Sequence, residues 1–211
     1  MEGDSVTLHT GVQMKQGRKI KWNFNSSHIA RICEYPCFSC TDVQCNKGKE
    51  RFRDRLKLDN QTGSLTIRDI RTTDSGLYDL LIMRFGVRGS RRTKVFLVAV
   101  HGVSAAEQHE MKRKSVKEGE SVTLDTRVIK KQNNSITWCF NDTLIAEITG
   151  DQSKICTDER FKDRLKLDNQ TGSLTITNIR TTDSGLYKLQ ITRSRFSIIR
   201  SFSITVTGEY Y

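Results

Sequence analysis

Polar and apolar residues alternate in short runs along this chain, which is the pattern of β-strands that bury one face. In Ser5–Leu8 valine and leucine alternate with serine and threonine, and residues 64–67 repeat this pattern. Every second residue of 20–24 is large and apolar. Turn-forming residues separate such runs, as in 59–63, where Asn, Asp and Gly favour a hairpin. Because helical periodicity is almost absent, the pattern predicts an all-β chain.

One long segment occurs twice. Residues 51–82 recur at 160–191 with few differences, and the motif EGDSVTL at 2–8 recurs as EGESVTL at 118–124. Self-similarity of this length indicates one structural unit used twice. We therefore predict two domains, 1–101 and 107–208, joined by a linker at 102–106. The chain starts abruptly compared with the second copy, so we expect a fragment whose first half-strand is missing.

Each copy carries two signatures of an immunoglobulin variable-like sandwich. The first is a tryptophan on an alternating strand, Trp22 or Trp138. The second is an Asp-x-Gly-x-Tyr motif that ends at Tyr78 or Tyr187, the pattern of a tyrosine corner. The chain is thus predicted to form two tandem V-like β-sandwiches.

The inter-sheet disulfide common in such domains is not expected. The bridging positions hold Thr10 and Leu80 in the first copy, and Thr126 and Leu189 in the second. Each core would then be held by packing alone, without the few kcal/mol that a disulfide adds.

These motifs resemble a known family. Variable-like domains without the core disulfide, with Arg-Leu-x-Leu-Asp-x-x-Thr-Gly-Ser-Leu-Thr-Ile leading to Asp-Ser-Gly-x-Tyr, resemble the signalling lymphocyte activation molecule family. They look most like its teleost relatives, including those similar to hepatic and glial cell adhesion molecules. The resemblance implies a cell-surface adhesion or immune receptor that binds through the G, F, C and C′ strands of its membrane-distal domain. It also implies structural ion pairs of Arg55 with Asp74 and of Arg164 with Asp183.

Composition indicates an extracellular protein with a basic surface. The net charge is +11, from 35 basic and 24 acidic residues, which suggests an anionic partner or a well-solvated basic surface. Nucleic acid is not expected, since no basic arm or RNA-binding signature is present. No apolar run is long enough to span a membrane, so we expect any membrane anchor outside this fragment. Five glycosylation sequons fit the cell surface: Asn25, Asn60, Asn133, Asn141 and Asn169.

The six cysteines fall into two groups. Cys139 follows Trp138 and is expected to face outward, where a bond to Cys156 would clip two neighbouring segments together. Cys33, Cys37, Cys40 and Cys45 lie in a segment that the second copy lacks. Nested and overlapped pairings are both feasible for these four. A four-thiolate zinc site is the alternative, but the spacing lacks two separated Cys-x-x-Cys knuckles, so we expect disulfides, no metal and no cofactor.

Catalysis is not expected. The four histidines are scattered, and no Ser/His/Asp or Cys/His grouping occurs at motif spacing. No glycine-rich phosphate loop follows a strand.

Comparison of the two copies predicts a binding face in the first domain. Its outward positions on the last two strands are apolar, at Leu81, Met83, Val95 and Leu97, where the second copy has Gln190, Thr192, Ser201 and Ser203. Arginines flank this patch: Arg84, Arg88, Arg91 and Arg92. An apolar centre with a charged rim is typical of protein interfaces.

The predicted partner is another immunoglobulin-type surface protein or a second copy of the chain. One alternative is that the cysteine segment 33–45 folds back and covers the patch. Another is a module for anionic glycans or lipid head groups that uses the basic F–G loop with Arg193, Arg195 and Arg200. A purely structural spacer is the third.

Overall fold

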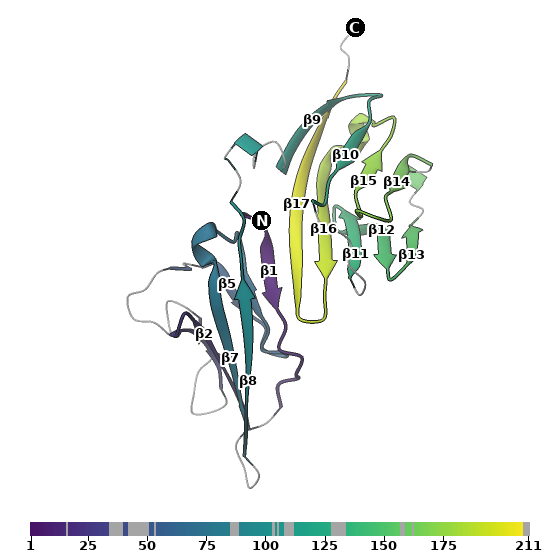
Figure 1. Ribbon diagram of the computed structural model, residues 1–211. Helices are drawn as coiled ribbons and strands as arrows, with labels where there is room; N and C mark the ends of the chain where they lie inside the picture. The colour runs from purple at the N-terminus through teal and green to yellow at the C-terminus, as the bar shows by residue number, and fades with distance from the viewer. Residues whose placement is uncertain are drawn as a thin grey trace. The chain divides into compact units, whose positions relative to one another are not determined.

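The computed structural model describes the chain in two compact units that divide at residue 102 (Figure 1). It describes residues 1–15, 17–33, 40–41, 51–52, 54–84, 89–102, 104, 106–107, 112–127, 134–156, 159–161 and 163–208. The regular elements of this part are strands with three 3-10 turns. The all-β prediction is therefore confirmed, while the individual boundaries 1–101 and 107–208 stay predictions.

Unit 1 contains two sheets. One has the order β4-β3-β2-β7-β8, and the other joins β1, β6 and β5. All of these pairs are antiparallel. The strand bounds are β1 Ser5–Leu8, β2 Arg18–Phe24, β3 Ser27–Ile32, β4 Cys40–Thr41, β5 Leu56–Leu58, β6 Leu65–Ile67, β7 Gly76–Arg84 and β8 Ser90–Val98.

Unit 2 repeats this plan, with one additional strand in the sheet that corresponds to β4-β3-β2-β7-β8, here called the front sheet. That sheet has the order β13-β12-β11-β16-β17, and β9 pairs with β17 in parallel. The second sheet has the order β10-β15-β14. The bounds are β9 Arg113–Lys117, β10 Val122–Leu124, β11 Ser135–Phe140, β12 Thr143–Thr149, β13 Gln152–Ile155, β14 Leu165–Leu167, β15 Leu174–Ile176, β16 Gly185–Thr192 and β17 Phe196–Thr207. The 3-10 turns are η1 Thr72–Asp74, η2 Glu159–Phe161 and η3 Thr181–Asp183.

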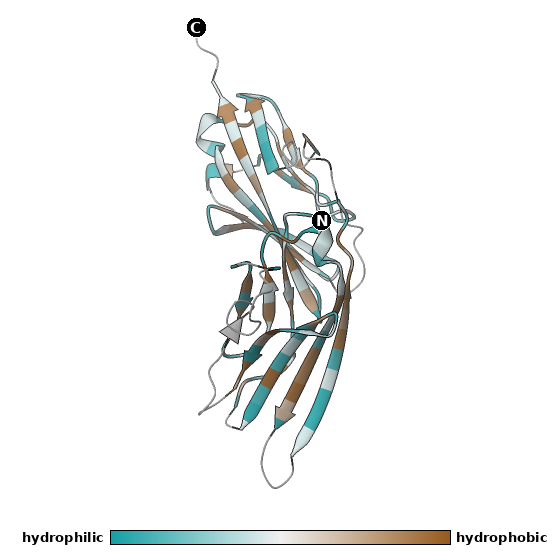
Figure 2. Ribbon diagram, turned by 90° about the vertical axis from the view of Figure 1, so that its left-hand side faces the viewer, coloured by the Kyte–Doolittle hydropathy of each residue, from teal (hydrophilic) through white to brown (hydrophobic). Residues whose placement is uncertain are grey.

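Each core is built around the predicted tryptophan. Trp22 and Trp138 are fully buried, and the alternating hydropathy of the strands is visible as bands in Figure 2. The indole N–H of Trp22 donates to the carbonyl of Gly63 at 2.9 Å. Gly63 has a φ of +68°, and a Cβ there would collide with Ile20. Only glycine therefore fits this turn, which holds the hairpin close against the indole.

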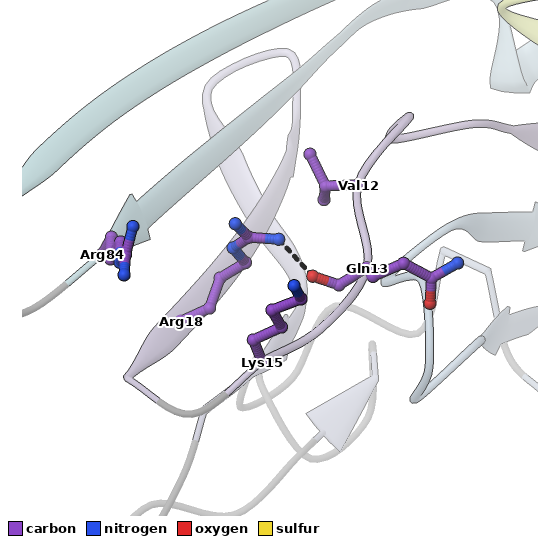
Figure 3. A pocket seen from close by; sticks show the side chains of 5 residues that line it. All are labelled: Val12, Gln13, Lys15, Arg18 and Arg84. Carbon is purple, nitrogen blue, oxygen red and sulfur yellow. Dashed lines mark hydrogen bonds between the residues drawn. The ribbon is translucent and has the colours of Figure 1, made fainter.

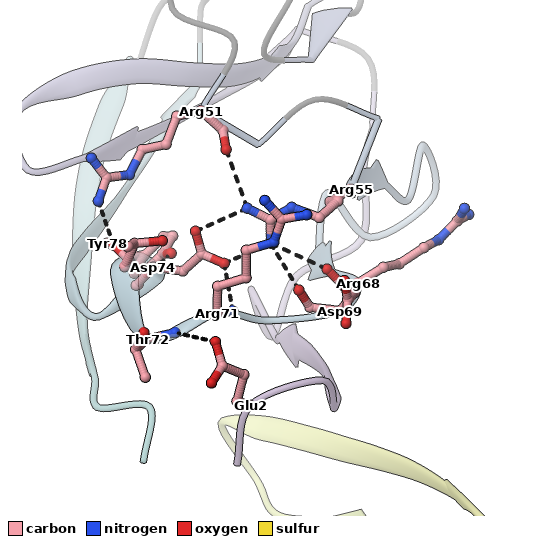
Figure 4. Close-up of polar contacts among 10 residues, drawn as sticks. Glu2, Arg51, Arg55, Arg68, Asp69, Arg71, Thr72, Asp74 and Tyr78 are labelled. Carbon is pink, nitrogen blue, oxygen red and sulfur yellow. Dashed lines mark hydrogen bonds and ion pairs between the residues drawn. The ribbon is translucent and has the colours of Figure 1, made fainter. Parts of the chain in front are cut away.

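A buried polar cluster closes the other end of the unit 1 core (Figure 4). Arg55 is paired with Asp74 through two hydrogen bonds of 2.6 and 3.0 Å, and the Tyr78 hydroxyl donates to the Asp74 carbonyl at 2.8 Å. The Asp74 hydrogen bond raises the pKa of Arg55 above its usual value, although burial opposes it. The ion pair that the family resemblance implies is thus present in unit 1.

Unit 2 contains the same cluster. Arg164 pairs with Asp183 at 2.6 and 3.1 Å, and Tyr187 donates to the Asp183 carbonyl at 2.8 Å. The two tyrosine corners were correctly predicted from the motif.

Hydrogen bonds replace the usual disulfide between the sheets. Thr10, Leu80, Thr126 and Leu189 are fully buried, so they do occupy the bridging positions. The Lys94 ammonium donates to the Thr10 carbonyl at 2.5 Å. At the matching place in unit 2, Arg200 donates to the Thr126 carbonyl at 2.7 Å. Arg200 is buried, so its expected role in binding an external anion is wrong.

The predicted Cys139–Cys156 bond is not formed, because both residues are free cysteines in the structure. The sequence did not reveal β13. Cys139 lies on β11 opposite Leu144 of β12, and the Cys156 N–H donates to Ile145 of the same β12. One strand therefore separates the two cysteines, and two strand spacings amount to about 9–10 Å. A disulfide requires Cα atoms within about 7 Å.

Candidate functional site

The outer face of unit 1, meaning the side of β3, β2, β7 and β8 that points away from the core, combines two different surfaces. Strand pairing sets residues of β7 between those of β2 and β8. Leu81 lies between Lys21 on one side and Thr93 on the other. Asp79 lies between Asn23 and Val95 in the same way.

The β7–β8 half of this face is apolar and exposed. Leu97 is 82% exposed and Val95 45%, while Leu81 and Met83 are partly buried. Leu97 pairs with Leu77, which is also exposed. Val95 and Leu97 are open to solvent. Most of the cysteine segment 33–45 lies outside the described residues, so the alternative in which it covers the patch stays a prediction. At Cys40–Thr41 that segment extends the edge of the sheet beside β3.

The β2–β3 half of the same face is basic, which sequence reasoning missed. Lys19 and Lys21 alternate with the buried residues of β2, and Arg31 pairs with Lys21 from β3. The matching residues of unit 2 are Ser135, Thr137 and Glu147, by their places on β11 and β12. The signal was available in the sequence, because the same comparison that exposed Leu81 also applies to these positions.

His28 of β3 lies close to these cations. Burial lowers the pKa of His28 below its usual value, and the charges of Lys21, Arg31 and Lys19 lower it further. The His28 Nε2 and Arg31 Nε atoms are buried and have no hydrogen-bond partner in the described part of the chain. The cations Lys19, Lys21 and Arg31 on this half favour a negatively charged contact.

Of the four rim arginines, the structure places only Arg91 in the outward row of β8. Arg84 pairs with Ser90 and Arg92 pairs with inward-facing Ile82, so alternation directs Arg84 and Arg92 to the other side. Arg88 lies outside the described residues. The predicted patch and rim are therefore brought together only in part.

Unit 2 lacks this combination on its corresponding face. Its β17 presents Ser201, Ser203 and Thr205 to solvent together with one apolar residue, Ile199, and its β16 presents Gln190. Leu186 matches Leu77 and is similarly exposed, so Leu77 does not distinguish the two units. Val95 and Leu97 do distinguish them.

The structure describes four of the five glycosylation sequons. Asn25, Asn60, Asn141 and Asn169 are exposed, and Asn133 lies outside the described residues. Asn25 and Asn141 occupy matching turns, and each accepts a backbone N–H through its side-chain oxygen. Glycosylation at these sites stays a prediction.

Cys33 is disulfide-bonded, which a zinc-bound thiolate could not be. Cys37 and Cys45 lie outside the described residues, as does the side chain of Cys40, so the pairing among the four stays a prediction. Across the described residues, no cluster of three or more His, Cys, Asp or Glu could hold a metal ion. In the same part of the chain, no helix has the length and apolar character needed to cross a membrane.

Comparison with known proteins agrees with this fold. Residues 109–207 match the family model of the immunoglobulin V-set domain. The human B7-H4 IgV-like domain is 24% identical over 45% of this chain and 91% of its own, with a TM-score of 0.39. CD84, whose crystal structure concerns SLAM family function, is 22% identical over 46% of this chain and 98% of its own, with a TM-score of 0.41.

The amphioxus IgVJ-C2 molecule spans both units, at 15% identity, 97% of this chain, 98% of its own and a TM-score of 0.37. No curated protein sequence matches the chain. The matched residues form an immunoglobulin V-set domain, and the sheet orders, tryptophans and tyrosine corners described above show an all-β chain of two tandem immunoglobulin V-like domains without the usual inter-sheet disulfide.

Proposed function

We propose that this chain is part of a cell-surface recognition ectodomain and that the outer face of unit 1 binds a protein partner. The observation that supports this most directly is the exposure of Leu97 and Val95 at positions where unit 2 has serines. Contiguous exposed apolar residues on a soluble domain mark interaction sites. The V-set match of residues 109–207 supports a recognition role over an enzymatic one.

The charges on the face favour a partner that differs from this chain. Among the described residues of the face, Lys19, Lys21, Arg31 and Arg91 accompany one acidic side chain, Asp79. A second copy would bring the same cations, and like charges across an interface lower the association rate and the affinity. A partner with an apolar centre and carboxylates opposite β2 and β3 fits both halves.

The test is a pull-down in which the immobilised protein captures its partner from cell-surface proteins. Single substitutions in the protein are compared for the amount of partner captured. Leu97→Asp and Leu81→Asp should abolish capture of the partner, because each would bury an unpaired carboxylate in a dry contact. The matched changes Ser203→Asp and Gln190→Asp in unit 2 should leave capture unchanged. The free energy of unfolding of the Leu97→Asp variant should stay within about 0.5 kcal/mol of that of the parent, since this side chain is outside the core. Capture that survives both unit 1 changes would refute the proposal.

A basic surface also supports a second function, binding of an anionic glycan or lipid head group. The cations Lys19, Lys21 and Arg31 are the observation in its favour. Salt separates the two functions, because exposed charges are screened over about 8–10 Å at physiological ionic strength. Binding that disappears with added salt and survives Leu97→Asp would favour the anionic ligand.

A further inference from the structure

A cavity of about 420 Å³ lies at one end of unit 1, away from the outer face (Figure 3). It is lined by the loop between β1 and β2, the start of β2 and the end of β7. The lining residues are Val12, Gln13, Lys15, Arg18 and Arg84. Three of these five are cations and none is an acid.

Two of the cations face each other across neighbouring strands. Arg18 of β2 is the direct pairing partner of Arg84 of β7. Like charges in this position destabilise a sheet. The Arg18 guanidinium donates to the Gln13 carbonyl, and the Arg18 backbone N–H donates to the Lys15 carbonyl at 3.0 Å. These bonds hold the loop, and with it Lys15, next to the arginine pair.

The fold itself does not require this pair of arginines. By their places before Trp22 and Trp138, Arg18 of unit 1 matches Asn134 of unit 2, and Arg84 matches Arg193 through the long repeat. The second copy therefore places an amide where the first places a charge. A like-charge pair that only one copy contains calls for a reason other than folding.

We propose that this cavity binds the carboxylate or sulfate group of an acidic saccharide. Guanidinium groups present paired N–H donors that match the oxygens of such anions, and an anion between Arg18 and Arg84 would remove their repulsion. The volume lies within the usual range for small-ligand sites, about 300–1,000 Å³. Gln13 and Lys15 supply further polar groups for sugar hydroxyls, and both are exposed at the rim. Among the described lining residues, no large exposed apolar side chain is present.

The experiment measures binding of defined probes to the whole chain by calorimetry. The probes are a sulfated disaccharide, a sialylated trisaccharide, neutral lactose and inorganic sulfate. At least one acidic saccharide should bind, and Arg18→Gln and Arg84→Gln should each weaken it at least tenfold. Arg91→Gln, on the outer face, is the matched control and should change affinity less than twofold. Lactose should not bind.

A second measurement compares melting temperatures, first without ligand and then with added saccharide. Arg18→Gln should raise the melting temperature of unit 1, since it removes the repulsion from Arg84. Added saccharide should then raise melting of the parent but not of this variant. Saccharide binding that both arginine variants retain would overturn the proposal, and so would inorganic sulfate binding as tightly as the saccharides. Leu97→Asp should bind saccharide normally, so failure of the protein-partner proposal and failure of this one are distinguishable.

Discussion

Replacing Asp74 by Asn should destabilise unit 1 strongly and leave unit 2 unchanged. The Asp74 carboxylate is fully buried and accepts two hydrogen bonds from Arg55, and a third, of 2.9 Å, from the Arg71 backbone. Asparagine has nearly the same shape, so no cavity forms. What is lost is the negative charge opposite a guanidinium that is itself only 8% exposed.

The expected size follows from that geometry. Removing one partner of a buried ion pair costs about 3–5 kcal/mol, since the other charge stays buried without compensation. Arg55 keeps its hydrogen bond to the Asp69 carbonyl at 3.0 Å, which places the estimate at the lower end of the range. In a domain of this size each kcal/mol moves the melting temperature by about 4–8 °C. We therefore expect the unit 1 transition to fall by at least about 12 °C.

Differential scanning calorimetry on the whole chain gives the measurement, and the duplication gives the control. Asp183→Asn removes the same charge from unit 2 and should lower the other transition instead. A melting temperature of Asp74→Asn within about 4 °C of the parent would refute the reasoning, because it would mean that the pair contributes less than about 1 kcal/mol.

Three further predictions concern other groups. Burial raises the pKa of the Tyr78 hydroxyl above its ordinary value of 10.0, so the folded state keeps a proton that the unfolded state loses. The stability that the protonated Tyr78 hydroxyl contributes to the fold is complete below pH 10 and declines as the pH rises further. The free energy of unfolding, measured by urea titration above pH 10, should therefore fall less steeply with pH in Tyr78→Phe than in the parent. Burial also raises the pKa of the Cys139 thiol, so alkylation of the native chain should label Cys156 first, and a Cys139–Cys156 peptide in a non-reducing digest would contradict the structure. Finally, Arg31→Glu, which copies Glu147 of unit 2, should weaken partner binding at least tenfold with little change in melting; unchanged affinity would exclude an acidic partner surface.

The sequence was sufficient for the fold because its strongest signals concern the core. Alternation around Trp22 placed β2 correctly, and the Asp-x-Gly-x-Tyr motif identified the tyrosine corner at Tyr78. The edge of the front sheet was harder. Strand β13 has four exposed residues, so no alternation in burial marks it, and without it Cys139 and Cys156 looked like neighbours.

The candidate site was predicted only in part for a related reason. Exposed apolar residues such as Leu97 are conspicuous in a sequence because they break the expected alternation. Outward-facing lysines such as Lys19 and Lys21 obey this alternation, so the pattern did not reveal them. The prediction for the rim arginines was wrong for another reason. Arg84 and Arg92 are close to the patch in sequence, but strand register directs them to the opposite side of the sheet.

The distribution of differences between the two copies is itself an argument for function. Within the long repeat, two of the few changed positions, Asp79 and Leu81, lie next to each other on the outward side of β7. On β8, the outward residues Val95 and Leu97 are aliphatic where β17 has Ser201 and Ser203, whereas Thr93 stands where β17 has the exposed Ile199. Drift without constraint would seldom keep leucine exposed, since such surfaces favour aggregation. Exposed valine and leucine at positions where the other copy has serine are expected where that face is covered by a partner.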